Sequence, residues 1–231
     1  MARIIKIDNA IKKQFARREK MRGVETRIRR LYFLIVCEGE KTEPNYFNQL
    51  SKSLPRGAVE VTMDIEGAAR NTNSLVEYAE KYRKNSTVKY DRVWVVFDKD
   101  SFSDKNFNNA IQNALNNGFK TAWTNEAFEL WFLLHFQYVN HSMDRKNYQG
   151  FLEREVERIT GKKYKYKKND PNMHSFLLLH GNQKQASQWA EKLIKNFSDN
   201  KYATHNPSTR VHHLIEELQN PEKVWDEINA F

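Results

Sequence analysis

The stretch LYFLIVCEGEKTEPNYF, residues 31–47, decides the fold. Its first seven residues are continuously apolar, which is typical of a strand buried on both faces of a parallel sheet. Charged residues follow, and then Thr42-Glu43-Pro44 is typical of a helix start, with Thr42 as the capping residue and an early proline. The stretch therefore predicts a buried strand, a charged loop and a helix.

The next eighty residues repeat this alternation. The segments with strand character are 59–65, 92–97 and 119–123, and those with helical spacing are 42–54, 74–84 and 104–118. We expect Gly118 to end the last of these helices. The β-α-β-α-β-α-β order indicates a parallel sheet of about four strands flanked by helices. The most apolar strands, 31–37 and 92–97, should be central and adjacent, so the expected strand order is 2-1-3-4, with 59–65 at an edge.

The remainder of the chain is expected to be mainly helical. We predict helices in 126–136, 144–160, 182–197, 208–219 and 222–231. The expected organisation is a basic N-terminal arm at 1–30, an α/β catalytic domain at 31–137 and a helical C-terminal extension at 138–231. This length suffices to bury a hydrophobic core without covalent cross-links.

Composition excludes several classes of protein. Cys37 is the one cysteine in 231 residues, so a disulfide framework is excluded. The sequence has no run of about 18 apolar residues, and we expect no membrane span. The first residues lack the apolar core and cleavage site of a secretory signal. We expect a cytoplasmic protein.

Positive charge is concentrated in two places. Residues 1–30 hold eleven Lys/Arg and three Asp/Glu, most of the net charge of +9, and KKYKYKK at 162–168 is a second focus. Clustered cations release counterions when they neutralise phosphates, which favours nucleic-acid binding, and Tyr164 and Tyr166 between the lysines suit base stacking. The alternative is a solvated face. The candidate nucleic-acid contacts are Arg17, Arg18, Arg27, Arg29, Arg30, Lys162, Lys163, Lys165 and Lys167.

Acidic residues follow both predicted central strands. Glu38 ends the first, Glu43 begins the next helix, and Asp98 and Asp100 follow the strand at 92–97. On the expected topology they meet at the carboxyl edge of the sheet, where α/β proteins bind ligands. Clustered carboxylates favour a cation, and Mg²⁺ prefers carboxylate and water oxygens beside substrate phosphates. A phosphate-binding P-loop is excluded, because Gly39 and Lys41 lack its spacing.

These motifs resemble a known family. VCEGEKTEPNYF and VWVVFDKDSF are similar to the Toprim domain of topoisomerases, primases and some nucleases, and the resemblance is closer to RloB-like proteins of bacterial defence loci. NEAFELWFLLHF at 125–136 and HNPSTRVHHLIEEL at 205–218 resemble further motifs of that family. Asn125-Glu126 stands where the family usually has Asn-Pro. The resemblance implies a Toprim (Rossmann-like) fold and a Mg²⁺-dependent nuclease, a hydrolase used in abortive infection, with a partner ATPase in some loci.

The resemblance also implies roles for single residues. Glu38 matches the Toprim glutamate, Glu43 the second glutamate of the nuclease variant, and Asp98 and Asp100 the D-x-D pair. Glu129, in the apolar segment FELWFLLHF, needs a partner because a buried carboxylate is costly. We expect it to be a further metal ligand; the alternative is a structural ion pair with an arginine, such as Arg210.

Other candidates have less specific roles. Lys41 and Lys99 either hold a scissile phosphate or offset the acids, and Lys41 is included among the catalytic residues. His205, His212 and His213 lack the ligand spacing of a zinc motif.

The expected function is hydrolysis of phosphodiester bonds in RNA or DNA, with Mg²⁺, or Mn²⁺ in its place, as the cofactor. Two alternatives stay open: a phosphoryl or nucleotidyl transferase, and a nucleic-acid-binding or sensor module whose acids bind a structural cation. A homo-oligomer is also left open.

Overall fold

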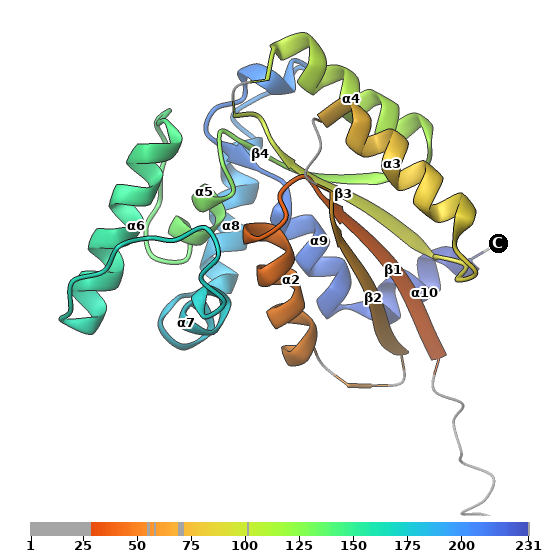
Figure 1. Ribbon diagram of the computed structural model, residues 1–231, viewed down its shortest axis with the longest axis horizontal. Coiled ribbons are helices and arrows are strands. Elements are labelled where there is room, and N and C mark those ends of the chain that lie inside the picture. The colour runs from red at the N-terminus through yellow and green to blue at the C-terminus, as the bar shows by residue number, and fades with distance from the viewer. Residues whose placement is uncertain (1–28, 55, 58, 69–71, 101, 231) are drawn as a thin grey trace, which may run out of the picture.

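The sheet has the predicted order with one added strand. The computed structural model describes residues 29–230 except 55, 58, 69–71 and 101 (Figure 1). In these residues the sheet order is β2-β1-β3-β4-β5. The strands are β1 (Arg29–Cys37), β2 (Val59–Gly67), β3 (Arg92–Asp98), β4 (Lys120–Asn125) and β5 (Ser208–Thr209). The first four are parallel, as predicted, and β5 pairs antiparallel with β4.

The apolar run of β1 is buried on both faces of the sheet. Phe33 and Ile35 belong to one hydrophobic cluster, whereas Leu34 and Val36 belong to another. Successive side chains of a strand point to opposite faces, so a strand covered on both sides must be apolar throughout. The 2-1-3-4 order with β1 and β3 at the centre is therefore confirmed.

Helices cover both faces of this sheet (Figure 1). One face is covered by α3 (Thr72–Asn85) and α4 (Asp104–Asn116), and the other by α2 (Thr42–Ser53), α9 (Val211–Gln219) and α10 (Pro221–Asn229). To one side of the sheet lie α5 (Glu129–Leu133), α6 (Arg145–Thr160), α7 (Met173–His180) and α8 (Gln183–Ile194). A short 3-10 helix, η1 (Tyr202–Thr204), precedes β5.

The boundaries of α4 and α6 follow from local chemistry. Ser103 accepts a hydrogen bond from the Asn106 amide at 3.3 Å, and Asp144 accepts one from Asn147 at 2.8 Å. Such side chains satisfy amides that have no partner in the first turn. Gly118 has φ +71° just after α4, which confirms its predicted role as a C-terminal cap.

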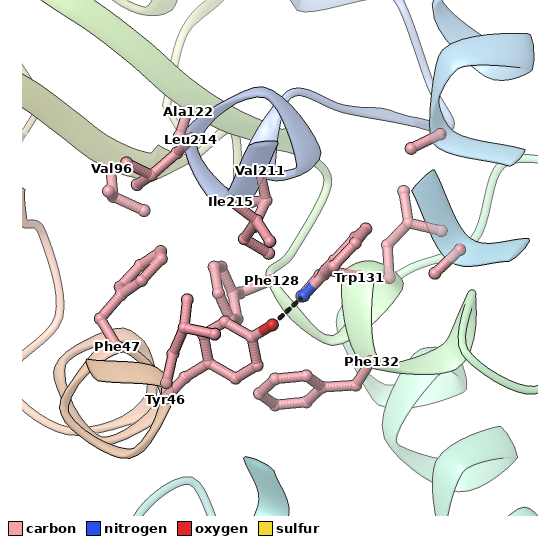
Figure 2. Packing of buried hydrophobic residues seen from close by; sticks show 14 of the residues in the cluster. Tyr46, Phe47, Val96, Ala122, Phe128, Trp131, Phe132, Val211, Leu214 and Ile215 are labelled. Atoms are coloured by element: carbon pink, nitrogen blue, oxygen red, sulfur yellow. Dashed lines mark hydrogen bonds between the residues drawn. The ribbon is translucent and has the colours of Figure 1, made fainter. Parts of the chain in front are cut away.

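The segment after β4 is buried as expected but is mostly not helical. Its helix, α5, is limited to Glu129–Leu133 and is followed by turns. Figure 2 shows Phe128, Trp131 and Phe132 facing Tyr46 of α2, and the Trp131 indole N–H donates a hydrogen bond of 2.9 Å to the Tyr46 hydroxyl. The apolar pattern predicted burial correctly but could not limit the length of the helix.

Two other expectations for the C-terminal part were wrong in detail. Residues 208–209, expected to start a helix, form β5, where the Thr209 hydroxyl hydrogen-bonds that of Thr124 at 2.9 Å. The helix α7 was not predicted. No helix among the described residues is long and apolar enough to cross a membrane.

Candidate metal centre at the carboxyl edge of the sheet

The predicted acidic residues meet where β1 and β3 end. Glu38, Glu43, Asp98, Asp100 and Glu129 line one cavity of about 460 Å³. The Glu38 amide donates to the Val96 carbonyl at 2.9 Å, which continues the β1–β3 pairing beyond β1. The Asp98 amide donates to Glu38 Oε2 at 3.2 Å, so the two acids are held side by side. Lys41, the predicted catalytic lysine, lines the same cavity and is exposed.

Two glycines allow the loop after β1 to fold closely over the site. A Cβ at Gly39 would lie 2.5 Å from Glu43 Oε2, which is closer than atoms can approach. A Cβ at Gly67 would lie 2.8 Å from the Glu40 backbone. A side chain at position 39 would therefore displace the Glu43 carboxylate, and one at position 67 would displace the backbone of the loop. Thr42 is not the helix cap that we expected: Lys41 holds that position, and the Thr42 hydroxyl donates to the Lys168 carbonyl at 2.9 Å.

Asp98 and Glu129 are, with Glu43, the most buried acids of the site. Asp98 is 6 % exposed; its Oδ2 accepts the Phe128 amide at 3.0 Å, but its Oδ1 is buried without a hydrogen-bond partner in the described part of the chain. Glu129 is 2 % exposed, and its Oε1 accepts a hydrogen bond from Gln149 at 2.9 Å. A buried acceptor with no donor is costly, so Asp98 Oδ1 has an unfilled requirement for a donor or a cation.

An arginine that the sequence did not reveal lies among these acids. Arg145, the first residue of α6, has its Nη1 2.7 Å from Asp100 Oδ2 and its Nη2 2.9 Å from Asp98 Oδ2. Its Nε lies 3.9 Å from Glu129 Oε2. Asp100 itself has φ +36°, in the left-handed region that aspartate tolerates better than most residues. Arg145 is 45 residues beyond Asp100, and no spacing rule in the sequence connects them.

The contact between Arg145 and Glu129 shows which basic side chain lies beside Glu129. The alternative to metal binding was an ion pair with an arginine such as Arg210. Among the described residues, the arginine beside Glu129 is Arg145, and no ion pair joins Glu129 to Arg210. Glu129 thus lies with the acidic cluster, as expected of a further ligand, and also beside a basic group.

Burial changes the acidity of the cluster. It raises the pKa of Glu38 to about 7, helped by the charges of Glu43 and Asp100 and opposed by the Asp98 amide and Arg145. Burial likewise raises the pKa of Glu43, with the Glu129 charge adding to it, and raises that of Asp98 far above its ordinary value, with the Glu43 charge adding to it. These pKa values stay raised although Arg145, Lys41 and Lys168 line the same cavity, so the site favours a further positive charge.

The donor set fits a hard divalent cation. All five side chains offer carboxylate oxygens, which Mg²⁺ and Mn²⁺ prefer. Asp98 Oδ1, which has no hydrogen-bond partner among the described residues, and the raised pKa of Asp98 both favour a cation at this site.

The basic segment at residues 162–168 lies partly beside the acidic cavity. Lys162, Lys163, Lys165 and Lys167 are exposed, as binding to nucleic acid requires. Lys168, which we did not single out, lines the acidic cavity, because the Thr42 contact holds its backbone against α2. Tyr166 is buried, 9 % exposed, so the expectation that it stacks on bases was wrong. Tyr164 is half-buried and donates to Asp170 at 2.9 Å.

The arginines of the N-terminal arm lie elsewhere or beyond the described residues. Arg29 and Arg30 begin β1 and are exposed, so they are separated from Glu38 by nearly the whole strand, about 25 Å. The Arg29 guanidinium lies over the Trp225 ring, 5.4 Å from its centroid. Arg17, Arg18 and Arg27 fall outside the residues that the structure describes.

Lys99, the other lysine near the acids, is not among the residues that line the cavity. Its Nζ lies 3.2 Å from Asp104 at the start of α4. This partner is not one of the clustered acids, so neither role expected of Lys99 is tested by the contact.

Comparison with known proteins adds one match. A family model described as RloB-like protein matches residues 33–218, which include every acidic residue of the cavity. No curated protein and no solved structure shows significant similarity to the chain.

Proposed function

We propose that this chain, which belongs to the RloB-like family, is a Mg²⁺-dependent nuclease that hydrolyses phosphodiester bonds of RNA or DNA. The observation that carries the proposal is the convergence of five carboxylates from the ends of β1 and β3, the start of α2 and α5. One of their oxygens, Asp98 Oδ1, is buried and has no hydrogen-bond partner within the part of the chain that the structure describes. The family resemblance supports a role in anti-phage abortive infection, with a partner ATPase from the same locus.

The carboxylates divide by exposure into two groups. Asp98, Glu43 and Glu129 are each less than a tenth exposed. Glu38 and Asp100 are more accessible to solvent. When bound by these acids, Mg²⁺ would lower the pKa of water and stabilise charge on the leaving oxygen. The protein holds the acids at fixed separations through the Asp98–Glu38 and Phe128–Asp98 hydrogen bonds.

Basic side chains surround the acids and suit a phosphate ester. Lys41, Lys168 and Arg145 line the same cavity as the carboxylates. Without these basic side chains, the acids would repel a polyanionic nucleic acid. The basic side chains provide charged hydrogen-bond donors within the cavity for the nonbridging oxygens of a phosphate. The exposed lysines of 162–167 extend this positive surface along the chain segment that leads to Lys168.

Arg145 also favours a second candidate function. It already pairs with Asp98 and Asp100, so part of the cluster is neutralised without a metal. A site that is satisfied in this way suits a nucleic-acid-binding module or sensor whose acids have a structural role. That reading predicts binding without cleavage.

The test is incubation of the full chain with total cellular RNA and plasmid DNA, with and without Mg²⁺ or Mn²⁺. We expect new ends to appear only with metal and to disappear in Asp98→Asn, which keeps the acceptor for the Phe128 amide. Glu222→Gln, an exposed acid in α10 that does not line this cavity, is the matched control and should cut normally.

Three outcomes separate the candidates. Binding without cleavage, with the partner ATPase also present, would favour the sensor. Products that carry a transferred phosphoryl or nucleotidyl group would favour the transferase. Cleavage in chelator, or full activity of Asp98→Asn, would contradict the metal site.

A further inference from the structure

A second group of ligand-type side chains lies outside the acidic cavity, between α8 and α9. Glu191 comes from α8, and His212 and His213 come from the first turn of α9. Glu191 Oε2 lies 3.3 Å from His212 Nε2 and 3.4 Å from His213 Nε2. One ligand atom from each of the three residues lies within 4.8 Å of the other two.

These separations are long for hydrogen bonds but suit a shared ion. An N–H···O hydrogen bond is usually about 2.7–3.2 Å, so both contacts with Glu191 exceed the usual range. Zinc–nitrogen and zinc–oxygen bonds are about 2.0–2.2 Å, and tetrahedral geometry then separates two ligand atoms by about 3.3–3.5 Å. The Glu191–His212 and Glu191–His213 distances fall in that interval.

We propose that Glu191, His212 and His213 bind one Zn²⁺, or a related first-row divalent ion, at a site separate from the acidic cluster. Two imidazoles and one carboxylate are a donor set of zinc proteins, whereas an all-carboxylate cluster suits Mg²⁺ and Mn²⁺. Glu191 is 41 % exposed and His213 is 31 % exposed, so solvent can reach the open fourth position.

The surroundings prepare these ligands. Lys195 Nζ lies 3.3 Å from Glu191 Oε1, which orients the carboxylate and leaves Oε2 facing the histidines. Burial lowers the pKa of His212 to about 4, and burial also lowers the pKa of His213, so both imidazoles are neutral and able to coordinate at neutral pH. Arg210 opposes a cation here, since its charge contributes to both decreases.

The ion would connect α8 to the sheet through α9. Helix α9 directly follows β5, and its buried Leu214 and Ile215 pack in the main core (Figure 2). The buried face of α8 includes Ala186 and Ala190. Binding to the folded state alone raises its stability by mass action, so zinc should raise the melting temperature of the full chain.

The experiment measures Zn²⁺ affinity by competition with a chromophoric chelator, in excess Mg²⁺ that occupies the acidic cluster. The variants are His213→Gln and Glu191→Gln, both at partly exposed positions where folding should survive. His180→Gln, an exposed histidine at the end of α7, is the matched control. Melting temperatures in chelator check the fold of each variant. Co²⁺ absorption in the visible region reports the coordination geometry.

We expect one zinc per chain, affinity at least about tenfold weaker in both site variants, and unchanged affinity in the control. The wild-type Co²⁺ spectrum should be tetrahedral and should be lost in His213→Gln. Stoichiometric binding that all three variants retain would place zinc elsewhere and overturn the proposal. Absence of binding to folded wild type would show that Glu191 only accepts long hydrogen bonds.

Discussion

The substitution Glu38→Gln should stabilise the metal-free protein, although it removes a residue of the site. Burial raises the pKa of Glu38 from 4.5 to about 7, so the folded state resists its ionisation. Each pKa unit is worth about 1.4 kcal/mol, so the full cost of ionising this group is about 3 kcal/mol. Glutamine carries no charge and can still accept the Asp98 amide hydrogen bond, now 3.2 Å long, through its own oxygen.

The sign depends on pH in a defined way. Below pH 4.5 Glu38 is protonated in both the folded and the unfolded chain, and wild type bears no cost. As the pH rises from 4.5 to about 7, the unfolded chain ionises first, and wild type loses stability relative to Glu38→Gln. The advantage of the variant should therefore be near zero at about pH 4.5 and should approach about 3 kcal/mol at about pH 8.

The assay is urea unfolding of both proteins in chelator at those two pH values. Glu222→Gln, an exposed acid in α10 outside the acidic cavity, is the control and should show no comparable gain. Excess Mg²⁺ should reverse the order, because it stabilises wild type more than the variant. A gain that is equal at both pH values, or a loss near pH 8, would refute the reasoning that charge repulsion and burial strain this site.

Four further results are expected. Asp98→Asn should abolish cleavage and should not lower stability in chelator near neutral pH, measured by calorimetry, because burial raises the pKa of Asp98 far above its ordinary value and asparagine carries no charge; the same activity as wild type would count against Asp98 as a ligand. Arg145→Gln should lower the melting temperature in chelator by several degrees, and Mg²⁺ should restore most of this loss because the divalent ion replaces the lost positive charge. The control Lys146→Gln, at an exposed position, should show neither the loss nor the recovery. If Mg²⁺ does not restore the melting temperature of Arg145→Gln, the ion and Arg145 do not share a site. Glu129→Gln should weaken Mn²⁺ binding measured by calorimetry while the fold holds; a loss of stability with unchanged affinity would make Glu129 a structural partner of Arg145. Deletion of residues 1–28 should weaken nucleic-acid binding and flatten its salt dependence without slowing turnover at saturating substrate; an unchanged slope would mean that the arm has another partner.

The sheet could be predicted because its strands carry the signal themselves. The unbroken apolar run at 31–37 and its counterpart at 92–97 are consistent only with central strands, and the alternating residues of 59–65 indicated an edge. That order places the residues that follow β1 and β3 together, so the convergence of Glu38, Asp98 and Asp100 followed from topology.

Arg145 and β5 could not be predicted, for a common reason. Both depend on where α6 to α9 pack relative to the sheet, which is set by tertiary contacts rather than by local pattern. Arg145 resembles any surface arginine at a helix start, and Ser208-Thr209 is too short to show strand periodicity. The same applies to Glu191, whose relation to His212 and His213 appears only when α8 packs against α9.

The most direct test of the central claim uses a substrate with a sulfur in place of a nonbridging oxygen at the scissile phosphate. Mg²⁺ prefers oxygen ligands, whereas softer ions such as Mn²⁺ and Cd²⁺ accept sulfur more readily. If ions held by Glu38, Glu43 and Asp98 contact the phosphate during cleavage, the normal substrate should be cut with Mg²⁺. The substituted one should be cut slowly with Mg²⁺ and recover with the softer ions. Equal cleavage of both substrates with Mg²⁺, or cleavage that persists in chelator, would contradict the claim that metal ions held by these acids contact the scissile phosphate.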